Sequence, residues 1–507
     1  MFELKGSLKA LVACWGALSL LTPLQAALIK ANVDLEDRIG IVGKEFYGGF
    51  IEHLGRNVYG GIYDPTDKMA DEDGFRRDVI AEMKTLRTSI FRYPGGCFTD
   101  LWRWEDGIGP RNERPVRIDP FWKQLEDNSF GLDEFMKWLA KVNAEPMITI
   151  NLSTRGLPEA VQMWEYLRFP KGTTLSDQRR RNGCENRYPI RYWCLGNELY
   201  GHWEYGHREP ERYGNDAREV AKFLKQTDPD AVTILSGSES NQKWNETVLD
   251  LAWKWTDYLS IHMGTYSKGK DFPRVADLFA GNLERTFETI KRVNARKPSN
   301  ERKEMKISVD EYFIWDDVNG DDGTEFTKGR HLLENDYTIL DAVVLGDLHI
   351  TLHNHADAVK FANIAQSVNA IAPIRTEKDG KLWHQAIYDP LLWSSTYGRG
   401  VALRFKWFGN EAGDLRASAI WNDENARLAV FVVNRAEKEA HDFKMAVSGN
   451  WLVEASKEVS GERMAKNGPD AEPVRARDTR DASFASGSLS VPMKPCSWRM
   501  VVLKLQN

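Results

Sequence analysis

The sequence predicts an α/β protein, a (β/α)8 TIM barrel followed by a C-terminal all-β sandwich domain. Three observations favour this fold. Short apolar or β-branched runs alternate eight times with helical patterns between residues 46 and 362. A polar residue closes almost every run, as expected where barrel strands end at an active site. After about residue 385 the strands follow one another without helices, which is typical of a sandwich.

Eight barrel strands are expected, at 46–51, 88–93, 146–151, 190–195, 231–235, 257–262, 305–310 and 357–362. The segments between them carry apolar residues at helical spacing, such as Val79, Ile80 and Met83. The predicted domains are a signal peptide at 1–26, an N-terminal strand segment at 27–45 that pairs with the sandwich, the catalytic barrel at 46–385 and the sandwich at 386–507.

The first 26 residues have the pattern of a signal peptide. Lys5 and Lys9 precede an apolar run at 10–21 that is too short to span a bilayer, and Ala26 lies where a signal peptidase would cut. We therefore predict a secreted or periplasmic protein that is not held by a membrane after cleavage. The remaining cysteines are too few and too scattered for a disulfide framework, and a Cys184–Cys194 bridge is left open.

Composition narrows the class of partner. The 507 residues are 42% hydrophobic and 28% charged, with a net charge of −6, so no basic surplus exists to bind nucleic acid. The 11% aromatic content, with 18 Trp, suits a protein that stacks rings on flat apolar faces. No Cys-x-x-Cys, Gly-x-Gly-x-x-Gly or Gly-x-Ser-x-Gly motif occurs, which argues against structural zinc, a dinucleotide cofactor and a serine esterase.

The densest histidine group is His349, His353 and His355. His349 and His353 have the i, i+4 spacing of a helical metal pair, but the glutamate of the zinc motif is missing. A structural role is expected for this group, and neither a metal nor a cofactor is predicted.

Two glutamates at strand ends indicate the chemistry. Glu198 ends the fourth strand and Glu311 the seventh, and these strands lie across the barrel mouth from each other. Glycoside hydrolysis needs such a pair, one acid to protonate the leaving oxygen and one carboxylate on the other side of the sugar ring. A separation of about 5–5.5 Å would retain configuration and about 6.5–9.5 Å would invert it, and the sequence leaves this distance open. The charge of Glu311 is expected to favour a proton on Glu198.

Seven motifs are spread over nearly the whole chain: FIEHLG at 50–55, VYGGIYDP at 58–65, RYPGGCF at 92–98, WEDGIGP at 104–110, EDNSFG at 126–131, WCLGNE at 193–198 and AQSVNAIAP at 365–373. Together they resemble the α-L-arabinofuranosidases of glycoside hydrolase family 51. The resemblance implies a retaining exo-enzyme that releases terminal L-arabinofuranose from polysaccharides or oligosaccharides by double displacement. It also implies a homo-oligomer, since relatives are often hexameric.

The resemblance implies Glu198 as the acid/base and Glu311 as the nucleophile. The substrate-binding residues predicted with them are Glu52, Arg92, Cys97, Trp104, Asn197, His262, Tyr266, Trp315 and Gln366.

Three places depart from the family pattern. Residues 310–315 read DEYFIW, where Trp-Asn usually follows the Glu. Cys97 stands where many members have Asn. Gly264 stands where a Tyr usually follows the histidine, so the hydroxyl that orients the nucleophile is either missing or supplied by Tyr266 from a rearranged loop. Two rival functions therefore stay open: another glycosidase on this scaffold, such as an endo-β-1,4-glucanase or a galactofuranosidase, and a sugar-binding protein without turnover.

Overall fold

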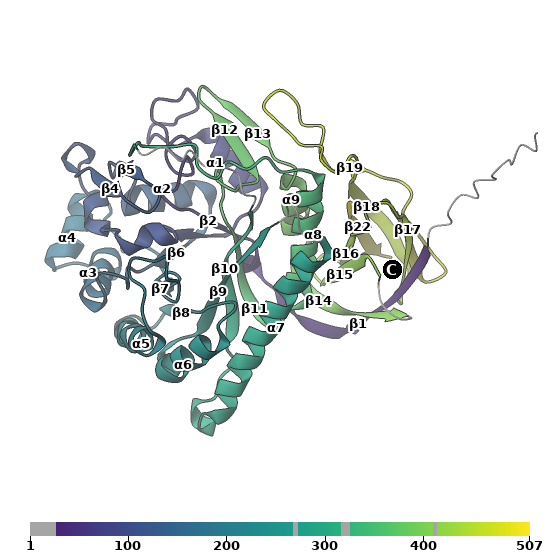
Figure 1. Cartoon of the computed structure of the whole chain (residues 1–507), viewed down its shortest axis with the longest axis horizontal. Helices are drawn as coiled ribbons and strands as arrows, with labels where there is room; N and C mark the ends of the chain where they lie inside the picture. The colour runs from purple at the N-terminus through teal and green to yellow at the C-terminus, as the bar shows by residue number, and fades with distance from the viewer. Residues whose placement is uncertain (1–26, 267–271, 316–324, 409–412, 507) are drawn as a thin grey trace, which may run out of the picture.

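A computed structural model of the chain describes residues 27–266, 272–315, 325–408 and 413–506. It confirms the predicted fold, a closed barrel wrapped by helices beside a C-terminal β domain (Figure 1). The barrel strands are β2 (Gly48–Phe50), β3 (Ile90–Tyr93), β6 (Glu145–Thr149), β7 (Tyr192–Leu195), β8 (Val232–Ser236), β9 (Tyr258–Tyr266), β10 (Lys306–Trp315) and β11 (Val359–Ile364). Each pairs in parallel with its neighbours, and β10 and β11 close the ring onto β2.

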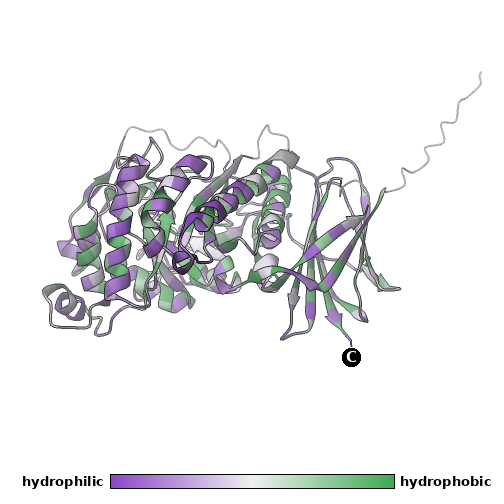
Figure 2. Cartoon of the chain, turned by 90° about the horizontal axis from the view of Figure 1, so that it is seen from below, coloured by the Kyte–Doolittle hydropathy of each residue, from purple (hydrophilic) through white to green (hydrophobic). Residues whose placement is uncertain are grey.

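Helices cover the outside of the barrel. They are α1 (Arg77–Thr85), α2 (Leu132–Val142), α3 (Leu157–Arg168), α4 (Thr174–Arg181), α5 (Pro210–Thr227), α6 (Gln242–Ala252), α7 (Phe272–Arg296), α8 (Ile339–Asn354) and α9 (Tyr388–Tyr397). Hydrophobic and hydrophilic residues alternate along most of them (Figure 2), as expected of helices with one buried face. In the part of the chain that the structure describes, no helix has the length and apolar composition needed to cross a bilayer.

The C-terminal domain is one ten-stranded sheet. Its order is β19-β18-β22-β16-β15-β14-β1-β17-β21-β20, and β18 contacts β20, so the two ends of the sheet fold toward each other. The strands are β14 (Gly400–Phe408), β15 (Leu415–Asn422), β16 (Arg427–Asn434), β17 (His441–Ala446), β18 (Trp451–Val459), β19 (Arg477–Asp478), β20 (Ser483–Ala485), β21 (Ser488–Met493) and β22 (Ser497–Leu505). The first strand of the chain, β1 (Ala27–Val42), lies antiparallel to β14 and parallel to β17.

Helix α8 joins the two parts. It is buried on every side from Ile339 to His353, because one face packs on the barrel and the other on β14, β15 and β16. Gly346 permits the closest approach, since a Cβ there would lie 2.0 Å from Cδ1 of Trp498 on β22. The histidines at 349 and 353 lie in this junction.

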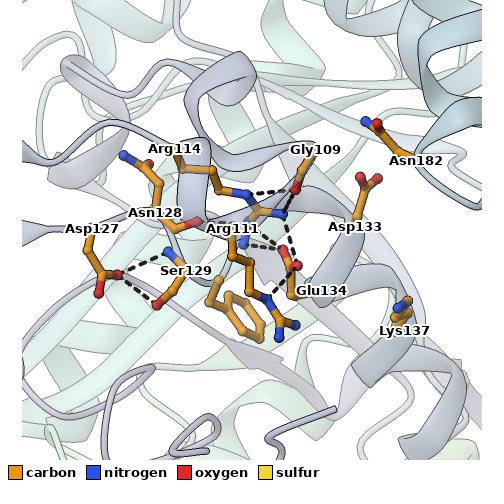
Figure 3. A network of polar contacts seen from close by, with 12 residues as sticks. Gly109, Arg111, Arg114, Asp127, Asn128, Ser129, Asp133, Glu134, Lys137 and Asn182 are labelled. Carbon is orange, nitrogen blue, oxygen red and sulfur yellow. Dashed lines mark hydrogen bonds and ion pairs between the residues drawn. The ribbon is translucent and has the colours of Figure 1, made fainter.

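A long loop between β3 and α2 forms one wall of the barrel mouth. It carries a small hairpin, β4 (Arg117–Asp119) and β5 (Gln124–Glu126). Arg114 anchors the loop: its guanidinium donates to both carboxylate oxygens of Glu134, at 2.9 and 3.0 Å, and to the Gly109 carbonyl (Figure 3). Because Glu134 also caps the first turn of α2, the loop is tied to the barrel frame.

The described cysteines, Cys97, Cys184, Cys194 and Cys496, are all free thiols. The Cys184–Cys194 bridge that the sequence left open is therefore not formed. Cys194 instead lies inside the barrel on β7, where its thiol faces Asp310 at 3.5 Å.

Candidate active site

A pocket of about 360 Å3 opens at the carboxyl ends of the barrel strands, within the size range of small-ligand sites. It contains both glutamates that the sequence singled out. Its lining is Glu52, Leu54, Gly96, Cys97, Phe121, Trp122, Asn197, Glu198, Trp203, Glu311, Phe313, Trp315, Leu333, Gln366 and Ile371. The mixture of carboxylates, amides and aromatic rings suits a hydroxyl-rich ligand with flat apolar faces.

The two glutamates converge around one histidine. His262 Nδ1 lies 2.7 Å from Glu198 Oε1 and 3.4 Å from Glu311 Oε2, and one carboxylate oxygen of each glutamate lies within 4.8 Å of the other. A separation this small is nearer to the about 5–5.5 Å of retaining glycosidases than to the about 6.5–9.5 Å of inverting enzymes. Glu198 has a φ of 42°, a left-handed conformation that costs energy for a residue with a side chain and recurs at active sites.

Arg92 holds the floor of the pocket together. It is fully buried on β3, and its guanidinium donates from Nη1 to Glu311 at 3.0 Å and from Nη2 to Asn197 Oδ1 at 2.7 Å. Its Nε lies 3.3 Å from Asp310, so one guanidinium faces two carboxylates and an amide. This rigid fork fixes the orientation of Glu311 and Asn197 relative to each other.

The pKa values of the three central groups depart from the expected pattern. Burial raises the pKa of Glu311 to about 7, although His262 and Arg92 act in the opposite direction. Burial also acts to raise the pKa of Glu198, but the hydrogen bond and charge of His262 hold it below its ordinary value. The pKa of His262 is raised to about 9, because the charge of Glu311 and the bond to Glu198 outweigh burial.

The expectation that the charge of Glu311 favours a proton on Glu198 is therefore wrong. The physical reason is proximity, since the histidine lies closer to Glu198 than to Glu311. His262 instead carries the proton that Glu198 would need as an acid.

Glu52 forms a second anchor on the far side of the pocket. Its carboxylate accepts hydrogen bonds from the Phe98 backbone and the Trp122 indole through Oε1 and from Gln366 through Oε2, at 3.0 to 3.1 Å. Burial raises its pKa. Gly95 is required beside it, because Gly95 has a φ of 150° and a Cβ there would lie 2.5 Å from Glu52 Cγ.

Cys97 and Asn197 meet on a residue that the sequence did not single out. The Cys97 thiol donates to Glu204 Oε1 at 3.0 Å, and the Asn197 amide donates to the same oxygen at 3.2 Å. Burial is the main cause that raises the pKa of Cys97, and the neighbouring acids Glu204 and Glu198 act in the same direction, so it remains a thiol. Glu204 follows Glu198 by only six residues, and this nearness along the chain is the one signal that would have pointed to it.

The remaining predicted residues divide between the pocket and other places. Trp315 lines the pocket. Trp104 does not: it is 1% exposed and packs in the barrel core with its ring 5.2 Å from that of Tyr166, because a core position buries both faces of the indole. Tyr266 is the last residue of β9, and its side chain lies outside the described residues.

Phe313 occupies the space beside Gly264. The two residues are paired across β9 and β10, and a Cβ on Gly264 would lie 2.5 Å from the Phe313 ring. Among the described residues, no tyrosine hydroxyl bonds Glu311, whose carboxylate contacts Arg92 and His262 instead. The ring of Phe313 therefore adds an apolar wall where the family pattern has a polar side chain.

Four lining aromatics were missed by the sequence reasoning, Phe313 and three others. Trp203 is 45% exposed and donates its indole N–H to Glu198 Oε2 at 2.8 Å, while Phe121 and Trp122 come from the turn between β4 and β5. No local pattern distinguishes these rings from the many aromatic residues in the core.

A larger cavity of about 520 Å3 is lined mainly by residues of the loop between β3 and α2, among them Asn128, which is labelled in Figure 3. It is lined by Trp102, Asp119 and Asn128 among others but contains neither central glutamate. The smaller pocket is therefore the candidate active site, because chemistry requires converging reactive groups rather than volume.

Comparison with known proteins gives one consistent result. The family description "Alpha-L-arabinofuranosidase 1 domain" matches residues 82–285, and "Alpha-L-arabinofuranosidase C-terminal domain" matches residues 310–497. An intracellular exo-α-(1→5)-L-arabinofuranosidase from Acetivibrio thermocellus is 36% identical over 93% of this chain and 98% of its own, and a relative of that name from Bacillus subtilis is 36% identical over 94% and 99%. The solved structure of a family 51 α-L-arabinofuranosidase from Bifidobacterium longum is 32% identical, with a TM-score of 0.88 over 93% of this chain and 99% of that chain.

These comparisons contradict the predicted secretion. Both curated relatives are named intracellular, so the prediction of a secreted or periplasmic protein is wrong. Residues 1–26, on which it depended, lie outside the described residues. A short apolar run behind two lysines meets the compositional criteria for an export signal, but those criteria use local composition alone.

Proposed function

The chain belongs to the glycoside hydrolase family 51 α-L-arabinofuranosidases, and from this membership we propose which of its residues carry the reaction. The protein is a retaining α-L-arabinofuranosidase that acts on arabinose-containing substrates. The observation that carries the proposal is the convergence of Glu198 and Glu311, whose carboxylate oxygens lie within 4.8 Å around His262.

In the proposed first step, a Glu311 oxygen attacks C1 of the arabinofuranose and forms a glycosyl ester. The bond from C1 to the leaving oxygen breaks, and that oxygen takes a proton from Glu198. In the second step Glu198 removes a proton from a water molecule, which attacks C1 and releases Glu311 as a carboxylate. Two inversions at C1 give overall retention.

His262 is proposed to supply the proton that Glu198 needs in the first step. The reactive form has the proton on Glu198 and a charged Glu311, whereas the pKa shifts favour a protonated His262 and give Glu311 a pKa of about 7. His262 Nδ1 contacts both carboxylates, so a proton can move along the 2.7 Å hydrogen bond to Glu198 when the sugar excludes water. Arg92 then stabilises the charged Glu311.

The remaining polar residues are proposed to hold the sugar hydroxyls. Glu52 and Gln366 are bonded to each other on one side of the pocket, and Asn197 lies on the other, beside the acid. An amide next to the acid can donate to the 2-hydroxyl, a contact that strengthens as positive charge develops on the ring. Cys97 and Trp315 complete the proposed subsite.

The test is hydrolysis of an aryl α-L-arabinofuranoside. Glu311→Ala should abolish turnover, with a loss of about 10⁴-fold or more in kcat, while Glu239→Gln should not change it. Glu239 is a suitable control because it lies at the barrel mouth but does not line the pocket. NMR of the initial product should show the α-anomer. Full activity of Glu311→Ala, or an initial β-anomer, would contradict the assignment.

Three finer points remain proposals. Exclusive release of single arabinose units, with no internal cuts and no action on galactofuranosides, would separate this function from an endo-acting or galactofuranoside-specific enzyme. A homo-oligomer, hexameric by family resemblance, is to be tested by light scattering. The division into a strand segment at 27–45, a catalytic barrel at 46–385 and a sandwich at 386–507 is to be tested by limited proteolysis.

A further inference from the structure

Glu204 lies directly behind the pocket and is only 4% exposed. Its Oε1 accepts from the Cys97 thiol at 3.0 Å and from the Asn197 amide at 3.2 Å. Both donors line the pocket. The orientation of two pocket walls therefore depends on one buried acid.

The other side of the Glu204 carboxyl group faces a second buried acid, Asp100. Glu204 Oε2 and Asp100 Oδ2 are both buried, and within the described residues neither has a hydrogen-bond donor. The remaining oxygen of Asp100 accepts from the Ser153 hydroxyl. Burial, then a hydrogen bond to Asp100 and the charge of Asp100, raise the pKa of Glu204 to about 11. Two ionised carboxylates in contact away from water repel strongly, whereas one shared proton satisfies both oxygens.

We propose that Glu204 is a positioning residue that shares one proton with Asp100 and, as a neutral acid, orients the Asn197 amide and the Cys97 thiol toward the bound sugar. The inference rests on the proposed function, which assigns Asn197 and Cys97 to the sugar. The proton is bonded to Glu204 Oε2 and donated to Asp100 Oδ2, so Glu204 Oε1 acts only as an acceptor.

This arrangement leaves Asn197 one orientation. Arg92 donates to its Oδ1 at 2.7 Å, and Glu204 Oε1 takes one hydrogen of its Nδ2. The second Nδ2 hydrogen is left to donate to the sugar. A flipped amide would place its NH2 group against the Arg92 donor and its oxygen against the Glu204 oxygen, which loses both bonds.

A neutral Glu204 also limits the negative charge beside the acid/base. The Cys97 sulfur, one carboxylate oxygen of Glu204 and one of Glu198 lie within 4.8 Å of one another. The titratable groups that face Glu204 are Asp100 and Cys97 from the loop after β3 and Glu198 from the end of β7. An ionised Glu204 would add a like charge and raise the pKa of Glu198.

The first experiment compares two replacements of Glu204. Glutamine has the shape of the protonated acid and can place its NH2 toward Asp100, so Glu204→Gln should keep kcat and KM on the aryl arabinofuranoside within about threefold of the wild type. Glu204→Leu removes the acceptor for Asn197 and should lower kcat about 10²-fold, with a smaller change in KM. Equal losses in both variants would overturn the proposal, because they would mean that Glu204 acts as an ion.

Glu159→Leu is the matched control for the loss of a buried acid. Glu159 is 2% exposed on α3, pairs with Arg155 at 2.8 Å and does not line the pocket. It should lower the melting temperature and leave kcat unchanged. If Glu159→Leu lowers kcat as much as Glu204→Leu, the effect at 204 is a loss of structure and the proposal fails.

The second experiment removes the proton that Glu204 and Asp100 are proposed to share. Asp100→Asn provides an N–H to Glu204 Oε2, so Glu204 becomes ionised and the alkaline limb of kcat/KM should move up by about one pH unit. Adding Glu204→Gln to this variant should return the limb to its wild-type position. An unmoved limb in Asp100→Asn would overturn the proposal. Failure of the proposed function would instead appear as a wild-type protein without turnover.

Discussion

The barrel mouth and the α8 junction both bury histidines, but the mouth keeps its histidine protonated and the junction keeps its histidines neutral. His262 at the mouth is 7% exposed between two glutamates, and its pKa is raised to about 9. His349 in the junction is 1% exposed, bonds the Tyr312 hydroxyl at 3.0 Å, and its pKa is lowered by burial to about 3. His353 one turn later is also held neutral by burial.

The difference teaches that burial alone does not determine the charge of a side chain. At the mouth, carboxylates compensate the cost of burying an imidazolium, and the protonated ring joins reactive groups. In the junction, hydroxyl partners such as those of Tyr47 and Ser418 bond a neutral ring, and the histidines serve packing between barrel and sheet. The predictions below test this contrast, from the largest expected effect to the smallest.

Glu198→Gln should show that the mouth, and not the junction, carries the chemistry. Removing the general acid should lower kcat about 10³-fold on arabinosides with poor leaving groups, since general acid catalysis contributes about 10²–10⁴-fold. Substrates with acidic phenols as leaving groups need less protonation and should be less affected in the first step. Steady-state kinetics on a series of aryl arabinofuranosides measures this, and a loss independent of the leaving group would argue against an acid role.

His349 should make the free energy of unfolding depend on pH in the acidic range. Its folded pKa of about 3 lies below the value of about 6.5 in the unfolded chain, so the unfolded state binds the proton first as pH falls. Stability from this group is present above pH 6.5 and decreases by about 3 kcal/mol on lowering the pH to 4. When the free energy of unfolding is measured with urea between pH 4 and 7, it should depend less steeply on pH in His349→Gln than in the wild type. An equal pH dependence in both proteins would show that His349 does not titrate in this way.

His262 should give the free energy of unfolding the opposite dependence on pH. Its folded pKa of about 9 lies above the unfolded value, so its stabilisation is present below pH 6.5 and is lost as pH rises through 9. His262→Asn should therefore remove a decrease in unfolding free energy between pH 7 and 9. The same variant should lower kcat roughly tenfold and move the alkaline limb of kcat/KM to lower pH, because the proton that His262 holds up to about pH 9 must then be held by Glu198 alone. An unchanged pH profile would contradict the role of His262.

Ser418→Ala should have the smallest effect. It removes one hydrogen bond to His353, of 2.9 Å, and should lower the free energy of unfolding by about 1 kcal/mol. The kinetic constants should not change, because the bond belongs to the junction alone. A decrease in kcat would mean that the junction is coupled to the mouth.

Much of the fold could be predicted because its signals are local. Each barrel strand is a short run whose β-branched and apolar residues appear consecutively, and Glu198 and Glu311 follow such runs directly. The role of Glu204 could not be predicted in this way. It depends on Asp100, which is more than a hundred positions away in the chain and contacts it only after the loops of two strands pack together.

The aromatic residues show the same limit. Trp104 and Trp315 both lie near strand ends in the sequence, yet Trp104 is in the core and Trp315 is in the pocket. Composition and neighbouring residues do not distinguish them, because burial is a property of the assembled surface.

The sequence by itself determined the barrel, the C-terminal sheet and the pair of strand-end glutamates, since periodicity and motif spacing are written in consecutive residues. Only the tertiary structure decided the protonation of His262, the partner of Glu204 and the wall that Phe313 forms beside Gly264. These depend on distances of a few ångströms between residues far apart in the chain. Electrostatic energies and hydrogen bonds change steeply over such distances.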